Sequence, residues 1–600
     1  MKKGTKRFIV GVPLVIIAVL ALYFLSPDVK QFVSKTVTGI EQETSVVDNQ
    51  MATGKLSFPS SKPTSKPMPR IKFMGYLWNG VSGWSAAVGN NSPQTATLAT
   101  AEGSLMEKAG VNLVLESNES FDAIQNSQLS ALKEFHSGNN FPVNGAIGVW
   151  IMGDGAPYYI SVIQKRIDDI YGSGKYHAKV VAAAGLSYGE DRLIGPRAWK
   201  SDPQKLRGAL VSTVVGDGDW VIVVNYAAQL GIPVNPDEKT YDSNAVNFVH
   251  AEGGSIARAG QDFIASVKKG YKVELAEIVN GKRTGKTVQK AIDATSVWFP
   301  VDKQVFDAVG DGYVSLISTK EYNNQMPNTL IIIDEWAQKN SDLFEKMLVA
   351  MYTATNQVKQ YDEWLRYATE CNSKLFNMQN GDYWYRAFKG YSKAEGQEIG
   401  GTRVFNYADV QQYYGLSGTP SRYEPVYTQI AQYLEDLSPL GYKNEIKRTI
   451  PYEEAVNLTY VQNISSKMFD QSGEAYEVDY STNTGQIVTT GNFNITFRVG
   501  SDEIEPKGKE VVKQIYNQLA FSEDLKVNII GYTSSDGDDQ LNLTLSEKRA
   551  QAVRRELIRL GAKSERFGEV YGRGEENLIR DENGREDAIL SRRVEISTTK

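Results

Sequence analysis

The chain has 600 residues, 41% of them hydrophobic and 23% charged, so it is long enough for more than one globular domain. Its formal net charge of −6 leaves no basic excess to neutralise phosphates, which argues against nucleic-acid binding. The single cysteine excludes an internal disulfide, and the three histidines are far apart and lack metal-ligand spacing. We therefore expect no metal and no cofactor.

The N-terminus predicts a membrane anchor. A basic tail, residues 1–7, precedes an uncharged apolar run, residues 8–25, that is just long enough to cross a hydrocarbon core of about 30 Å. The lysines and arginine of the tail favour the cytoplasmic side, which would place the rest of the chain in the periplasm of a single-pass inner-membrane protein. A cleaved signal peptide is the alternative, but no clean small-x-small site follows. Residues 26–69 are polar and rich in Pro, Ser and Lys near their end, and we expect a periplasmic linker.

Residues 70–465 alternate short apolar runs with amphipathic stretches. Such runs of five to seven apolar residues indicate parallel strands covered on both faces, and therefore a two-lobed α/β domain. The runs are RIKFMGYLW, VNLVLES, GAIGVWIMG, KVVAAAGL, DWVIVVNYAAQLG, YVSLIST and TLIIIDEWAQ.

A Gly, Ser and Thr-rich linker, residues 466–491, separates this domain from a last segment, residues 492–600. That segment predicts a compact α+β module. Its expected order is strand (NFNITFRV), helix (KGKEVVKQIYNQLA), strand (LKVNIIGYT), helix opening at Leu545, the turn GEVYGRG and a final strand (RRVEIST).

Five motifs of the last segment resemble those of the OmpA-like, or MotB-like, peptidoglycan-binding domain, in order and in spacing. They are Asn494-Ile495-Thr496-Phe497, Gly531-Tyr532-Thr533-Ser534-Ser535-Asp536-Gly537, Asn542 with Leu545-Ser546 and Arg549-Ala550, Gly572-Arg573-Gly574-Glu575, and Ser591-Arg592-Arg593-Val594.

The resemblance implies a pocket for the zwitterionic end of a peptidoglycan stem peptide, in which an aspartate and an arginine hold the ammonium and the carboxylate. Arg549 matches the arginine, whereas the family's aspartate falls on Ser534 and its histidine on Tyr532. Asp536 could replace the aspartate if the loop is shaped differently. The remaining candidates for peptidoglycan contact are Asn542, Thr533 and Arg592. The alternative is that these acids are merely solvated and the arginines cover a helix face.

Residues 70–460 resemble periplasmic substrate-binding proteins of the type II, nitrate/taurine-like class. The likeness includes the subgroup fused to an OmpA-like domain and labelled as phosphate ABC-transporter components. The segments that carry the resemblance are residues 185–209, 231–249 and 318–336. It implies a ligand between two hinged lobes, at the carboxyl ends of strands. No Gly-rich phosphate loop supports phosphate as that ligand.

Polar or aromatic residues that follow predicted strands are the candidates for ligand binding. They are Trp78, Asn79, Trp84, Asp154, Ser187, Glu190, Asp191 and Trp298. The alternative is that the tryptophans are core or lobe-interface anchors and that the two adjacent acids cap a helix.

The sequence therefore predicts an inner-membrane-anchored solute receptor tethered to peptidoglycan, with an ABC-type permease or another envelope protein as a further partner. The competing hypothesis is a structural tether between membrane and wall, whose α/β domain is an interaction platform without a ligand. We expect no enzyme, because no nucleophile motif and no supported acid/base pair occurs.

Overall fold

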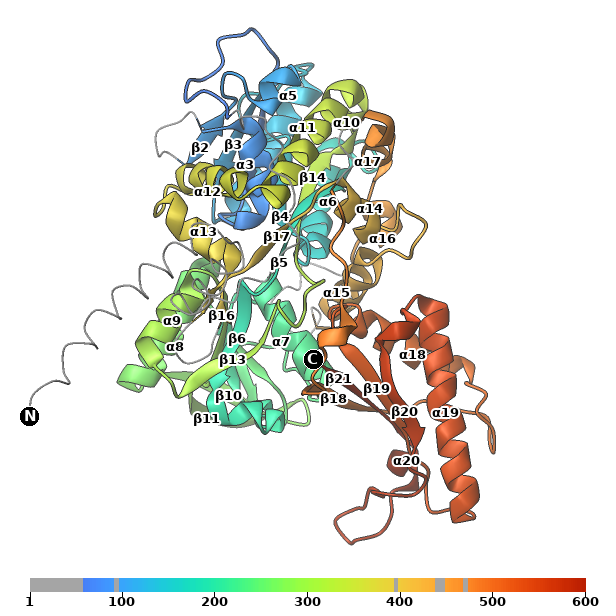
Figure 1. Ribbon diagram of the computed structural model, residues 1–600. Coiled ribbons are helices and arrows are strands. Elements are labelled where there is room, and N and C mark those ends of the chain that lie inside the picture. The colour runs from blue at the N-terminus through green and yellow to red at the C-terminus, as the bar shows by residue number, and fades with distance from the viewer. Residues whose placement is uncertain (1–57, 91–95, 393–397, 438–447, 468–472) are drawn as a thin grey trace, which may run out of the picture. The chain divides into compact units, whose positions relative to one another are not determined.

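The computed structural model describes residues 58–90, 96–392, 398–437, 448–467 and 473–600 (Figure 1). Of these, the residues from 58 to 391 and from 399 to 600 belong to one compact unit. The expected cytoplasmic tail, transmembrane helix and most of the first linker lie outside the described residues. Within the part of the chain that is described, no helix is long and apolar enough to cross a membrane.

The first lobe is built on a seven-stranded mixed sheet. Its strand order is β17 (Thr402–Val404), β5 (Ala178–Ser187), β14 (Pro327–Ile333), β4 (Gly148–Met152), β1 (Arg70–Gly75), β3 (Asn112–Ser117) and β2 (Thr97–Ala99). The helices that pack against it include α3 (Ser82–Val88), α5 (Phe121–His136), α6 (Ala156–Tyr171), α11 (Ser341–Gln360) and α12 (Asp362–Phe376). Strands β4 and β14 are buried along their whole length, as their continuous apolar sequences predict.

The second lobe is built on a five-stranded sheet. Its order is β13 (Tyr313–Ser318), β6 (Asp191–Pro196), β12 (Ala294–Trp298), β7 (Leu210–Thr213) and β9 (Asn247–His250). Helices α7 (Gly218–Gln229), α8 (Ile256–Lys269) and α9 (Val301–Val309) pack against this sheet. A separate small sheet contains β11 (Lys282–Ala291), β10 (Lys272–Val279) and β8 (Thr240–Asp242).

The two lobes are joined by two segments that we call crossovers. The first crossover, residues 188–190, connects β5 to β6, and the second crossover, residues 319–326, connects β13 to β14. Because the chain leaves the first lobe and returns to it, β14 runs antiparallel to both β4 and β5. The expectation of parallel strands therefore holds for β1 with β3 and β4, and for β7 with β9 and β12, but not for the whole of either sheet.

One apolar run predicted as a strand is a helix. The run from 219 to 231 forms α7, whose residues are almost all buried. A helix that is apolar all round is typical of a protein interior, and periodicity alone does not distinguish it from a buried strand. Its length of 12 residues was the signal for a helix.

The C-terminal module is a four-stranded sheet with two long helices. The strand order is β18 (Ile487–Phe493), β21 (Val594–Thr599), β19 (Lys526–Gly531) and β20 (Phe567–Gly572). Helices α18 (Pro506–Leu519) and α19 (Asp539–Leu560) supply Val512, Ile515, Ala550, Val553 and Leu557 to its apolar core.

Two elements of this module begin earlier than the sequence predicts. Strand β18 ends at Phe493, and Phe497 makes only an isolated bridge to Ile504, so the predicted strand from 492 to 499 is wrong for most of its length. Helix α19 begins at Asp539 rather than Leu545, because the carboxylate of Asp538 caps it by accepting from the backbone N–H groups of residues 540 and 541.

Both expected linkers contain residues that pack against folded structure. The ring of Phe58 lies 5.0 Å, centroid to centroid, from those of Trp364 and Tyr367. In the second linker, the backbone N–H of Tyr476 donates to the carboxylate of Asp409 at 2.6 Å. Each linker is therefore shorter than its composition suggests.

Candidate functional sites

The carboxylate of Asp154 lies where the two lobes meet. Asp154 follows β4 of the first lobe, and its Oδ2 accepts a hydrogen bond of 2.8 Å from Nε2 of Gln325 on the second crossover. The same Nε2 donates to the backbone oxygen of Gly218, at the start of α7 in the second lobe, at 3.1 Å. A Cβ atom added to Gly218 would lie 2.5 Å from Oδ2 of Asp154, so a glycine at this position allows the backbone of α7 to come close to the carboxylate.

A hydrogen-bond network joins the two crossovers. The hydroxyl of Ser187 donates to Oδ2 of Asp191 and lies 2.7 Å from Oγ1 of Thr319. The backbone N–H of Gly189 donates to the same Thr319 oxygen at 2.9 Å. All four residues are on or beside the crossovers, so this network lies where a hinge between the lobes would have to bend.

The start of α7 adds two acids that the sequence reasoning missed. Asp217 is the N-cap residue, and its Oδ1 accepts from the backbone N–H of Gly218 at 2.8 Å. Asp219 lies in the first turn, is 0% exposed, and has no hydrogen-bond partner at either carboxylate oxygen. The sequence Asp-Gly-Asp at the start of the helix was the available signal, but the apolar run that follows it predicts a strand.

We call Asp154, Glu190, Asp191, Asp217 and Asp219 the acid cluster. Burial is the main cause that raises the pKa of Asp219, and the charges of Asp191, Asp217 and Asp154 raise it further. Burial likewise raises the pKa of Asp154 and Glu190, and it raises that of Asp191 to about 7. The cluster therefore concentrates acidic groups that disfavour one another's charge.

The charge of Arg192 lowers the pKa of Asp191, but burial and the neighbouring acids raise it more. Arg192 is buried nearby, but its Nε lies 2.9 Å from Oδ2 of Asp302, and another of its nitrogens donates to the backbone oxygen of Gly189. Among the described residues, no three His, Cys, Asp or Glu side chains are arranged to hold a metal ion. The acid cluster therefore contains more acidic groups than the single guanidinium of Arg192 could neutralise.

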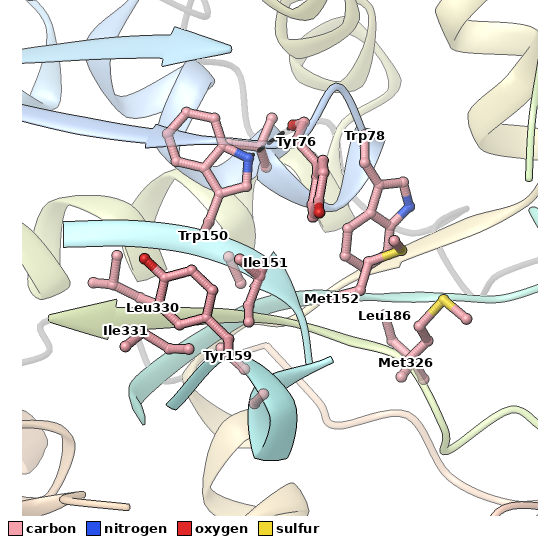
Figure 2. Packing of buried hydrophobic residues seen from close by; sticks show 14 of the residues in the cluster. Tyr76, Trp78, Trp150, Ile151, Met152, Tyr159, Leu186, Met326, Leu330 and Ile331 are labelled. Atoms are coloured by element: carbon pink, nitrogen blue, oxygen red, sulfur yellow. Dashed lines mark hydrogen bonds between the residues drawn. The ribbon is translucent and has the colours of Figure 1, made fainter. Parts of the chain in front are cut away.

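Aromatic side chains border the acid cluster. The indole N–H of Trp78 donates to Oε2 of Glu190, which joins the end of β1 to the first crossover. The ring of Tyr76 lies 5.9 Å from that of Trp298, across the two lobes, and the charge of Asp217 contributes to the raised pKa of Tyr76 after burial. Figure 2 shows Tyr76 and Trp78 in one apolar cluster with Met152, Leu186 and Met326.

The structure separates the predicted ligand residues into two groups. The first group lies at the junction of the two lobes and contains Asp154, Ser187, Glu190, Asp191, Trp78 and Trp298. Trp84, in contrast, is a core residue that packs edge-on against Phe73 at 5.3 Å. Asn79 is buried in a network in which its side chain donates to the backbone oxygen of Trp384 and accepts from Asn372. For Trp84 the structure favours the core alternative, and Asn79 is likewise fully buried.

The second candidate site lies in the C-terminal module, where β19 leads into α19. Gly531 and Gly572 end the adjacent strands β19 and β20, and a Cβ at either would lie 2.2 Å from backbone or side-chain atoms of Ser546. The hydroxyl of Ser546 accepts from the backbone N–H of Gly574 at 2.9 Å. Small residues in these three motifs therefore allow the helix to approach the strand ends closely.

The loop before α19 holds Asp536 at the surface. The hydroxyl of Ser534, at the family's aspartate position, is buried and donates to Oδ2 of Asp536 at 3.1 Å. The guanidinium of Arg592 lies 4.0 Å from the same oxygen. Asp536 thus has partners that orient it, although it is two residues beyond the family's aspartate position.

Arg549 is half-buried behind this loop. Its guanidinium lies 5.0 Å from the centroid of the Phe497 ring, and its Nε donates to the backbone oxygen of Ser501 at 3.1 Å. Burial and the charge of Arg592 lower the pKa of Arg549. Two neighbouring arginines favour an anionic ligand group at this point, although the charge of Asp502 acts on Arg549 in the opposite direction.

The remaining candidates for peptidoglycan contact, Asn542 and Thr533, are buried at the base of the loop that precedes α19. Asn542 donates to the backbone oxygen of Ser534 at 3.3 Å and to Oε2 of Glu575 at 3.2 Å. Thr533 donates its backbone N–H to Gly574 at 2.7 Å, and its buried hydroxyl has no partner. Both residues shape the loop, and Thr533 also offers an unused polar atom.

Residues 496–592 match the OmpA family. Among similar proteins, "Probable lipoprotein YiaD" of Escherichia coli (strain K12) is 35% identical over 104 residues, which cover 17% of this chain and 47% of that protein. "Outer membrane protein A" of Citrobacter freundii is 32% identical over 120 residues, covering 19% and 50%. The chain spans about half the length of these two relatives.

Two solved structures overlap the two-lobed module. The periplasmic nitrate-binding protein NrtA from Synechocystis PCC 6803 is 9% identical with a TM-score of 0.39, covering 68% of this chain and 92% of that one. A putative periplasmic sulfonate-binding protein, SsuA, from Methylobacillus flagellatus KT is 10% identical with a TM-score of 0.40, covering 69% and 99%. The assignment of two lobes rests on the sheet orders and crossovers described above. The chain therefore combines a two-lobed α/β module with a C-terminal OmpA-like domain.

Proposed function

We propose that this protein is a solute receptor of the cell envelope that is held at the peptidoglycan by its C-terminal domain. The observation that carries the receptor function is the convergence of polar groups from both lobes and both crossovers on one buried place. Asp154, Asp219 and Gln325 each keep a buried oxygen without a partner there. Buried polar atoms are normally hydrogen-bonded, and a bound solute would supply the missing partners.

The mechanism is closure of the two lobes on the solute. Opening would separate Asp154 in the first lobe from Gly218 in the second, which Gln325 now connects. The network around Thr319 would act as the hinge, because it joins the only two segments that we identify as crossovers among the described residues. The role is binding rather than catalysis, so no covalent step is assigned to any residue.

The C-terminal domain would bind the stem peptide of peptidoglycan, with Arg549 on its carboxylate and Asp536 on its ammonium. The support is the match of residues 496–592 to the OmpA family and the pairing of Asp536 with Ser534 and Arg592. One guanidinium and one carboxylate would match the two charged ends of a zwitterionic ligand. A periplasmic location, an anchor at residues 8–25 and delivery of the solute to a permease complete the proposal.

A structural tether is the second candidate, and one observation favours it. The protein's own side chains occupy the space between the lobes at Gly218. A Cβ atom added to Gly218 would lie 2.8 Å from Cε of Met326 and 2.5 Å from Oδ2 of Asp154. A platform without a ligand would have this self-filled junction.

Native mass spectrometry of the full-length protein, followed by denaturation and identification of any released small molecule, separates the two candidates. A released solute present in stoichiometric amount supports the receptor. An empty protein that also fails to respond in a thermal-shift screen of amino acids, amines, sulfonates, phosphates and muropeptides supports the tether instead.

A further inference from the structure

The chemistry of the acid cluster indicates which class of solute the lobes would hold. Five carboxyl groups come from four places. Asp154 follows β4, Glu190 lies on the first crossover, Asp191 begins β6, and Asp217 and Asp219 lie at the start of α7. The one arginine buried beside them, Arg192, is already paired with Asp302. An anionic solute would therefore enter a place that repels it.

The unsatisfied atoms are acceptors. Both oxygens of Asp219 and one oxygen each of Asp154 and Asp191 are buried without a partner. Gln325 provides an independent observation, because its amide N–H groups are used on Asp154 and Gly218 while its buried Oε1 has no partner. A ligand that satisfies these atoms must donate hydrogen bonds.

Aromatic rings at the same lobe junction narrow the chemical class of the solute further. Tyr76 and Trp298 approach each other from the two lobes, and Trp78 is hydrogen-bonded to Glu190 of the cluster. Aromatic faces beside carboxylates favour organic cations, which are attracted by both. The described residues also lack the spacing of three ligands that a metal ion would need.

We propose that the solute is a small organic cation whose ammonium or guanidinium group binds between Asp154 and Asp219, with Gln325 as a third acceptor. This inference rests on the proposed receptor function and specifies its ligand. It differs from what the nitrate and sulfonate-binding neighbours would suggest, since those proteins are named for anions.

Isothermal titration calorimetry on the full-length protein at pH 8 tests the inference with two cations, spermidine and L-arginine, and two anions, nitrate and phosphate. We expect at least one cation to bind and neither anion to do so. In Asp219→Asn, which keeps the shape but removes the charge, the affinity should fall at least about 30-fold, as expected when one partner of a buried charge pair is removed.

The matched control is Asp169→Asn, which removes an exposed carboxylate that pairs with Lys165 on the same helix. It should bind the cation as the unchanged protein does. Near-ultraviolet circular dichroism verifies folding, and Asp154→Asn replaces Asp219→Asn as the test variant if the latter does not fold.

The remaining outcomes separate the inference from the proposed function. Binding of nitrate or phosphate in place of the cations would overturn the inference and leave the receptor intact. Cation binding that is unchanged in Asp219→Asn would also overturn it, because the cation would then bind elsewhere. No binding of any probe, together with no co-purified solute, would overturn both.

Discussion

Gln325 donates a hydrogen bond of 2.8 Å to Asp154, and so links the second crossover to the end of β4. This contact places a neutral amide against a carboxylate that has no cationic partner among the described residues and whose other oxygen is unpaired. Such an arrangement costs folding free energy, because a buried polar atom without a partner is unfavourable. Ligand-binding sites often contain polar groups that destabilise the ligand-free protein in this way.

Removing one buried charge should therefore stabilise the ligand-free protein. We expect Asp219→Asn to raise the free energy of unfolding by roughly 1 kcal/mol or more, because an amide is cheaper to bury than an unpaired carboxylate and can donate to its acidic neighbours. Urea unfolding at pH 8 measures the change. Asp169→Asn, at the surface, should move it by less than about 0.5 kcal/mol. A loss of stability in Asp219→Asn alone would mean that its carboxylate has a structural partner.

The stability of the ligand-free protein should fall as the pH rises from 5 to 7. The pKa of Asp191 is raised to about 7 in the folded state from an ordinary value of 3.8. Between these values the folded protein holds a proton on Asp191 that the unfolded chain has lost. The contribution of Asp191 to the free energy of unfolding therefore decreases with pH and levels off above about 7. The raised pKa values of Asp154, Asp219 and Glu190 act in the same direction.

Urea midpoints measured at intervals from pH 5 to pH 8 report this slope. Glu107, whose pKa is lowered to about 2, gives the opposite slope only below its ordinary value of 4.5, outside the chosen range. Asp191→Asn should flatten part of the profile. A stability that rises with pH over this range would show that these acids are ionised and stabilised in the folded state.

Substitution of Trp84 tests whether a core residue affects stability without affecting solute binding. Trp84→Ala should cost about 3–5 kcal/mol in unfolding free energy, because it removes a buried indole that packs against Phe73. Solute binding by the fraction that remains folded should be unchanged. Trp78→Phe is the contrasting variant, since it keeps most of the packing but removes the hydrogen bond to Glu190. It should weaken binding more than it weakens stability.

Arg549 should control attachment to the wall. Arg549→Ala is expected to reduce co-sedimentation with purified sacculi at least about tenfold, because the carboxylate of the stem peptide loses its charged donor. Arg559→Ala is the matched control on the same helix, since Arg559 is exposed and pairs with Glu556. Equal sedimentation of both variants would remove Arg549 from the site while leaving the OmpA-like domain in place.

Asp536 should bind the ammonium group of the stem peptide, and so complement Arg549. Asp536→Asn is expected to weaken sacculus binding without unfolding the domain, because its carboxylate lies at the surface, where Ser534 and Arg592 orient it. Asp539→Asn, three residues away at the start of α19, is the charge-matched control. If Asp536→Asn binds normally while Ser534→Asp binds more tightly, the family's original aspartate position would be the relevant one.

The sequence predicted much of the fold because its signals are local. The apolar runs of β3, β4, β5 and β14 fall within a few residues of the observed strands, and the five motifs located the OmpA-like domain. Residues directly after strands led to Asp154 and to the first crossover. The failures have physical reasons: α7 is apolar all round, and a buried helix has no face pattern to reveal it.

The rest of the site depends on contacts between distant residues. Gln325 lies 171 positions from Asp154 and does not directly follow a strand, and only the return of the chain to the first lobe brings the two together. The Asp-Gly-Asp sequence could have marked Asp219 as a residue at a helix start, but its burial and its unpaired oxygens appear only in the structure. Neither property can be read from residue type or spacing.

The most direct test of the central claim is to ask whether one molecule holds a solute and the wall at the same time. Full-length protein is mixed with sacculi and radiolabelled spermidine or L-arginine, and the label and the protein in the pellet are measured. We predict that label pellets only with protein, that Asp219→Asn pellets without label, and that Arg549→Ala leaves both in solution. Protein that pellets without label for either cation, while remaining correctly folded, would contradict the account of a wall-tethered receptor for an organic cation.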